Sequence, residues 1–149
     1  TGRAIIAQPW RVVLDRWPDG GRIALPLLPV ISVTEVRLFN AAGVASLLAS
    51  TLYGLERGAE PPCLAVKGAP GPERARDGIE IDLVAGYGAT AADCPEPLRQ
   101  AMRLLVIAAY EARGPERAGA PQPAVIEAVD RLIAPYRHIK LGRSALEAA

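Results

Sequence analysis

The sequence predicts an α+β fold in which antiparallel β-strands and hairpins pack with two C-terminal helices. Short runs rich in β-branched residues precede residue 85, and the clearest run, residues 79–83, alternates apolar and acidic side chains. Two patterns of helical period follow, at residues 98–112 and 123–133. Fourteen glycines and fourteen prolines among 149 residues indicate many short elements and exclude a simple helical bundle.

The length and composition predict one domain over residues 1–137 and a C-terminal tail over residues 138–149. Half of the residues are apolar, which is enough for a core at this length. Seventeen basic and sixteen acidic residues are well mixed, so no basic surface typical of a specific nucleic-acid binder is indicated. Because the chain starts at Thr1 and enters a strand pattern at once, we expect the natural protein to have a further segment before it.

The first part of the chain reads as a series of strands separated by turns. Pro9 lacks a backbone N–H and is expected at a sheet edge or a bulge. Turns are predicted at Trp17–Gly21 and Asn40–Gly43, where glycine follows turn-forming residues. Residues 68–78 are predicted to form a polar loop whose Arg74 and Arg76 are solvated. The predicted strands are residues 4–15, 22–25, 30–39, 46–56, 63–67 and 79–83.

The first helix is the most apolar stretch of the chain. Asp93 stands three residues before Glu96 with Pro95 between them, an arrangement that predicts a capping box at the helix start. Leu104 and Ile107 extend the apolar surface almost all round, so the helix needs cover on more than one side. We expect this helix to form a core with the strand at residues 79–83. The predicted stripe is Leu98, Ala101, Met102, Leu105, Ala109 and Ala112.

No catalytic, cofactor or metal constellation is visible in the sequence. His138 is the single histidine, and Cys63 and Cys94 lack the spacing of a zinc site, so incidental free thiols are expected. Gly86-Tyr87-Gly88 lacks the third glycine of a phosphate loop and is interpreted as a turn that ends the strand. Glu80 and Asp82 share a strand face, where we expect solvent or a cross-strand arginine.

Arg99 and Arg103 lie one helical turn apart, and Glu96 precedes Arg99 by three residues. An ion pair within the helix explains this spacing. A polar stripe that faces a neighbouring subunit explains it equally well, and the sequence leaves both interpretations open.

The order of several segments resembles the head–tail connector, or adaptor, family of tailed phages. The family also occurs in prophages and in gene transfer agents. The most specific parts are the AGYG…P..LRQA junction at residues 85–101 and the LIAPYR ending at residues 132–137. The other matching segments are TGRAIIAQPWRVVLDRWP, IALPLLPVISV, IEIDLV and VIEAVD.

The resemblance implies a structural protein without enzymatic activity or cofactor. Members of the family begin with two short helices ahead of the TGR segment. They assemble as a ring, typically of about twelve copies, beneath the portal. The ring extends the DNA channel, through which DNA passes without sequence-specific binding, and it contacts stopper or tail proteins. No membrane contact is implied, and the expected location is the particle neck, after assembly in the bacterial cytoplasm.

By position, the resemblance places portal binding on the C-terminal tail. For contacts between subunits, the residues indicate the apolar first helix and the exposed β-hairpins. A stopper or tail-completion protein of the same particle and a small ligand-binding domain remain as alternatives. The expected subunit-interface residues are Arg99, Arg103 and Tyr110, and the expected portal-binding residues are His138, Ile139, Lys140, Leu141, Arg143 and Leu146.

Overall fold

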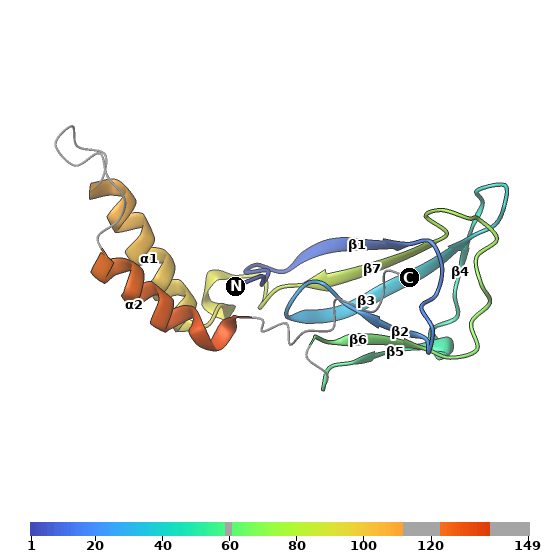
Figure 1. The fold of residues 1–149 in the computed structure, drawn as a ribbon, viewed down its shortest axis with the longest axis horizontal. Helices are drawn as coiled ribbons and strands as arrows, with labels where there is room; N and C mark the ends of the chain where they lie inside the picture. Colours follow the sequence, from blue (N-terminus) through green and yellow to red (C-terminus); the bar gives the residue numbers. More distant parts are fainter. Residues whose placement is uncertain (59–60, 112–122, 138–149) are drawn as a thin grey trace. The chain divides into compact units, whose positions relative to one another are not determined.

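The computed structural model describes residues 1–58, 61–111 and 123–137 and confirms the α+β class. Within these residues the chain forms two compact units. Arg3–Asp93 contains the strands (the β unit), and Thr1–Gly2 with the chain from Cys94 onward contains the two α-helices (the helical unit). Figure 1 labels the elements of both units. The predicted extent of one domain over residues 1–137 stays a prediction, and residues 138–149 lie outside the described part.

The elements follow the predicted order closely. The β unit contains β1 (Gln8–Leu14), β2 (Arg22–Ala24), β3 (Val30–Phe39), β4 (Ala45–Leu47), β5 (Tyr53–Glu56), β6 (Cys63–Val66) and β7 (Ile79–Ala85), with 3-10 turns at Ser50–Leu52 and Ala91–Asp93. The helical unit contains α1 (Glu96–Glu111), α2 (Pro123–Ile133) and a 3-10 turn at Ala134–Tyr136. The predicted strand at 46–56 is in fact two strands separated by a turn.

Strand β7 lies inside a four-stranded antiparallel sheet with the order β1-β7-β3-β4. Its alternating sequence places Ile79, Ile81 and Leu83 on the buried side, each at most 1% exposed. Pro9 lies in β1 at the sheet edge, as its missing donor requires.

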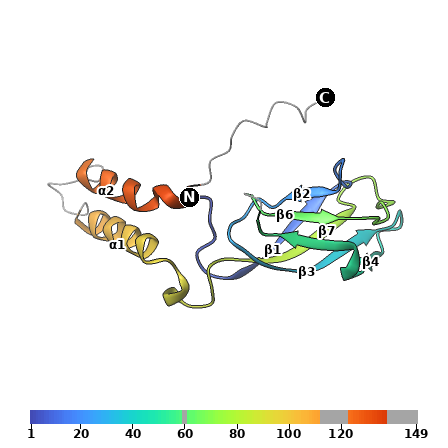
Figure 2. The same cartoon turned by 90° about the horizontal axis from the view of Figure 1, so that it is seen from below.

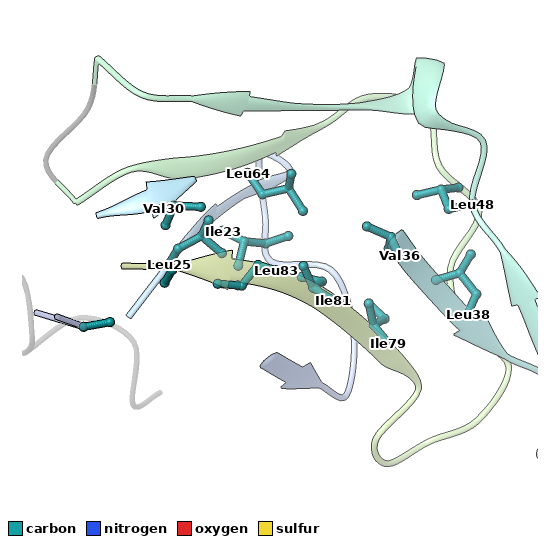
Figure 3. Close-up of a cluster of buried hydrophobic side chains, with 12 residues drawn as sticks. Ile23, Leu25, Val30, Val36, Leu38, Leu48, Leu64, Ile79, Ile81 and Leu83 are labelled. Carbon is teal, nitrogen blue, oxygen red and sulfur yellow. The ribbon is translucent and has the colours of Figure 1, made fainter. Parts of the chain in front are cut away.

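A second sheet covers the apolar side of β7. It has three antiparallel strands in the order β2-β6-β5 and contributes Ile23 and Leu64 to the core. Figure 3 shows these two side chains facing Ile81 and Leu83 of the first sheet. Every buried residue of this cluster falls between residues 4 and 85, so the core is built by sheet on sheet. The expectation that the first helix shares a core with the 79–83 strand is corrected accordingly.

Two bulges in β3 explain why its sequence does not alternate cleanly. The pairing with β7 shifts between Val30 and Ser32 and again between Val33 and Glu35. Each extra residue reverses the side to which the following residues point. Val30, Val36 and Leu38 are thereby buried in the core, while Glu35 pairs opposite Asp82 on the other face.

The predicted turns are present, and the loop at 68–78 is better anchored than its sequence indicates. The Gly21 N–H donates to the Pro18 carbonyl over 3.0 Å. Trp17 Nε1 donates to the Pro70 carbonyl over 2.8 Å, which ties the loop to the β1–β2 turn. Arg74 is exposed, as expected for a solvated side chain, and its guanidinium also lies 5.7 Å from the centre of the Phe39 ring.

Helices α1 and α2 lie side by side in both views (Figures 1 and 2). The buried residues of α1 are Leu98, Ala101 and Ala108, and that of α2 is Val129. The predicted stripe is therefore wrong in part, because Met102, Leu105 and Ala109 are exposed; Ala112 lies outside the described residues. The small side chains at 101 and 108 allow close approach of a second helix, whereas the larger side chains point outward.

The predicted capping box is also wrong. The Asp93 carboxylate accepts from the backbone N–H and the hydroxyl of Thr90, over 2.8 and 2.9 Å. It therefore binds a residue that precedes it in the chain and not the N–H groups of the helix. Helix α1 begins at Glu96 instead, and the Pro95 carbonyl accepts from the Leu98 N–H over 3.0 Å.

The burial pattern makes a direct prediction about stability. Ile81→Ala removes a fully buried side chain and should lower the free energy of unfolding of the β unit by roughly 2–5 kcal/mol. Both tryptophans, Trp10 and Trp17, lie in this unit, so urea denaturation followed by fluorescence measures it. Leu105→Ala, at a position 45% exposed, is the control and should cost less than about 1 kcal/mol. Equal losses in the two variants would contradict the sheet-on-sheet core.

Candidate functional site

The described residues contain no cluster of three or more His, Cys, Asp or Glu side chains arranged to hold a metal ion. They also contain no helix with the length and apolarity that a bilayer crossing demands. Cys63 and Cys94 are both free thiols. The predicted portal-binding residues 138–146 lie outside the described part. The candidate sites are therefore surfaces of the two units, and three of these surfaces carry specific side-chain or backbone contacts.

The first surface is the outer face of the four-stranded sheet, where charged side chains of three strands meet. Arg11 Nε donates to Asp82 over 2.7 Å, and Arg11 Nη1 lies 3.2 Å from Glu80. Arg37 reaches the same two carboxylates from β3, at 3.0 Å from Asp82 and 3.1 Å from Glu80. Arg37 also pairs with Glu35 on its own strand. We call these five residues the outer charge network.

The network confirms the cross-strand arginine that the sequence analysis expected for Glu80 and Asp82. The hydrogen bond from Arg11 is the main cause that holds the pKa of the Asp82 carboxyl below its usual value, and the charge of Arg37 acts in the same direction. A catalytic acid requires a carboxyl that retains its proton. The depressed pKa of Asp82 has the opposite effect, so this carboxylate joins the strands.

The second surface is the segment that follows β7 and carries the AGYG motif. The N-terminal residues run beside it: the Ala7 N–H donates to the Gly88 carbonyl over 2.7 Å, and the Tyr87 N–H donates to Ile5 over 3.2 Å. The Gly86 N–H donates to the Pro29 carbonyl over 2.9 Å. The motif is thus held by two other parts of the chain.

Steric contacts require glycine at both glycine positions of the motif. A Cβ on Gly86, which has φ +140°, would lie 2.5 Å from the backbone of Ile6 and Ala7. A Cβ on Gly88 would lie 2.4 Å from the Asp93 side chain, which is occupied by its bonds to Thr90. The hydrogen bonds from Thr90 also lower the pKa of the Asp93 carboxyl, so the segment ends on a charged, ordered turn.

The third surface is the outer side of α1. Arg99 and Arg103 both bind Glu96, the latter over 2.8 Å, so the ion pair predicted from their spacing is present. Tyr110 is 74% exposed. Whether these three residues contact a neighbouring subunit stays a prediction. The sequence reasoning missed the exposure of Met102, Val106 and Ile107 beside them, although the excess of apolar residues in this helix was the signal.

Comparison with known proteins identifies the class of molecule. No protein-family model matches the chain, and no curated protein matches it. A chain in the neck of an empty gene transfer agent particle, computed with C6 symmetry, is 33% identical, with a TM-score of 0.77 over 95% of this chain and 70% of that one. A chain in the virion of a native gene transfer agent particle is 33% identical over 95% and 71%, with a TM-score of 0.76.

A chain in the neck of the native particle, computed with C12 symmetry, is 32% identical over 95% and 75%, with a TM-score of 0.74. The chain belongs to the head–tail connector family. This connector protein is therefore a structural component of the neck of a phage-like particle. Within this fold, the AGYG junction that carried the sequence resemblance is the segment held between the N-terminal residues and Pro29.

The outer charge network predicts a specific acid sensitivity. Because the pKa of Asp82 is depressed in the folded state, its stabilisation is present above the unfolded pKa of about 3.9 and is lost as the pH falls through the folded value. The urea midpoint of Asp82→Asn should therefore fall less than that of the wild type between about pH 5 and about pH 2. Asp19→Asn, in the exposed β1–β2 turn, is the control and should follow the wild type. Parallel curves for all three proteins would refute this role.

The AGYG segment predicts that Gly86→Ala is strongly destabilising. The new Cβ would lie 2.5 Å from backbone atoms of Ile6 and Ala7, at a φ that L-residues rarely adopt. We expect a loss of roughly 1–3 kcal/mol in urea denaturation followed by tryptophan fluorescence. Gly54→Ala in β5 has nothing within 4 Å of its Cβ and should change stability by less than about 1 kcal/mol. Similar values for the two variants would show that the close approach at Gly86 does not limit stability.

Proposed function

We propose that this connector protein forms a ring beneath the portal of a phage or phage-like particle, extends the DNA channel and joins the head to the tail. The observation that carries the proposal is the similarity, over 95% of the chain, to chains in gene transfer agent necks computed with C6 and C12 symmetry. A cyclic neck component requires repeated contacts between identical copies, so the symmetry of those necks supports a ring.

The charge distribution supports a channel through which DNA slides. The net charge of the whole chain is +1. On the outer face of the four-stranded sheet, Arg11 and Arg37 are engaged by three carboxylates. Cations that are already paired with carboxylates neutralise few phosphates and release few counterions from DNA, so the affinity of such a surface for DNA is low. Passage without sequence-specific binding follows from such a surface.

The contacts with other particle proteins are assigned by resemblance. The tail, residues 138–149, is proposed to bind the portal, with His138, Ile139, Lys140, Leu141, Arg143 and Leu146 as its contact residues. The opposite side of the ring is proposed to bind stopper or tail proteins. This role does not require any covalent bond to be formed or broken, and we propose that the protein is not an enzyme.

Deletion of residues 138–149 tests the portal assignment. The truncated protein should keep its far-ultraviolet circular dichroism and tryptophan fluorescence, because both tryptophans and the described strands and helices lie before the deletion. It should lose co-sedimentation with purified portal rings. Val44→Ser, in the exposed β3–β4 turn, is the control and should co-sediment like the wild type. Unchanged attachment of the truncated protein would refute the tail assignment, and failure of the wild type to attach would refute the connector role itself.

A further inference from the structure

Strand β1 is the longest edge strand in the part of the β unit that the structure describes. The four-stranded sheet ends at β1, which has seven residues, and at β4, which has three (Figure 1). The three-stranded sheet ends at β2 and β5, with three and four residues. A short edge offers few backbone groups to another chain, whereas a long edge is a template for a further strand. The edge of β1 is therefore the main place where a second chain can pair with the β unit.

The hydrogen bonds at the two ends of β7 show which of its backbone groups face β1. The Gly86 N–H donates to the Pro29 carbonyl, and the Phe39 N–H donates to the Gly78 carbonyl. At both ends, an even-numbered residue thus directs its backbone groups toward β3. Because this direction alternates along a strand, the odd-numbered residues of β7 direct theirs toward β1.

The register then assigns the backbone groups of β1. The odd-numbered residues of β7 lie opposite the even-numbered residues of β1, which are residues 8, 10, 12 and 14. The backbone groups of Pro9, Arg11 and Val13 consequently point to the free edge. Arg11 and Val13 each present an N–H there. Pro9 presents none, and its ring occupies the place of the missing donor.

The rest of β1 favours strand pairing. Trp10 and Val13 are residues of high strand propensity and are 40% and 43% exposed. A charged side chain can guard an edge, but the Arg11 guanidinium is directed across the sheet to Asp82 on β7. Pro9 is therefore the group on this edge that opposes pairing.

The open stretch of β3 has a block of its own. Strand β4 pairs with β3 only at Arg37–Phe39, which leaves the first part of β3 without a strand beside it among the described residues. The two bulges interrupt the regular spacing of backbone groups in that part. Arg57 Nη2 also donates to the Ile31 carbonyl over 2.7 Å, so this acceptor is already occupied.

We propose that Pro9 blocks the free edge of β1 against strand pairing with a second copy of this chain. Every copy carries the same β1, and two antiparallel copies of one strand form a two-fold, self-complementary contact. In a pairing centred on Arg11, Pro9 of each copy lies opposite Val13 of the other and leaves its carbonyl without a donor. The net charge of +1 gives two copies little mutual repulsion, so the block must come from the backbone.

The block goes beyond the proposed function and has a consequence for it. A two-fold contact closes on itself, whereas a cyclic ring of more than two copies needs head-to-tail contacts. Dimers joined through β1 would therefore withdraw copies from the ring proposed above. Pro9 keeps the free chain available for assembly through other surfaces.

Self-association of the free chain, measured by sedimentation velocity over a range of concentrations, tests the block. Pro9→Val restores an N–H at the free edge of both copies and should raise the association constant roughly tenfold over the wild type. Gln8→Val is the matched control, because it adds the same side chain at an exposed residue whose backbone faces β7. It should associate like the wild type. Pro9→Ala restores the N–H without apolar bulk and should act in the same direction as Pro9→Val, which guards against misfolding of one variant.

Amide hydrogen exchange identifies the contact residue by residue. In the wild type, the Arg11 and Val13 amides should exchange fast at every concentration, while the Trp10 and Val12 amides are protected by β7. In Pro9→Val, the Arg11 and Val13 amides should become protected as the concentration rises.

Three results would overturn the block. They are association of both Pro9 variants at the wild-type level, association without protection of Arg11 and Val13, and protection of these two amides in the wild type. All three concern the free chain and leave the connector role standing, which fails instead if the wild-type chain does not attach to portal rings.

Discussion

The fold of the β unit depends on the alternation of side chains along β7. One face of this strand supplies Ile79, Ile81 and Leu83 to the core between the two sheets. The other face supplies Glu80 and Asp82, which Arg11 and Arg37 hold from the two neighbouring strands. A shift of one residue in the register would bury the carboxylates and expose the apolar residues. The same seven residues therefore fix both the core and the order β1-β7-β3.

The helical unit faces a different constraint, because two helices have too little surface to bury an apolar helix such as α1. The interface with α2 uses the small residues Ala101 and Ala108, and the larger residues are left outside. This arrangement costs a free monomer an exposed apolar surface. A contiguous exposed apolar surface of this kind is typical of a binding surface.

The sequence was informative where a local pattern determines the structure. The alternation at 79–83, the glycine turns and Pro123 at the start of α2 all correspond to observed elements. It was misleading where a competing contact determines the structure. The Asp93 carboxylate accepts from Thr90, three residues earlier, instead of capping α1. The bulges in the pairing of β3 with β7 explain the mixed pattern of burial in β3. The buried side of α1 was likewise set by α2, which approaches at the alanines instead of the larger Met102 and Leu105.

The AGYG segment combines hydrogen bonds and close backbone packing at the end of β7. Here the segment is bonded to Ala7, Ile5 and Pro29, and its glycines allow backbones to approach where a Cβ would collide. Each bond is modest, but all must break together before the segment leaves the sheet. The motif that carries the family resemblance in sequence is therefore also a closely packed structural element. Its glycines are explained by the close approach of the N-terminal residues, without reference to any ligand.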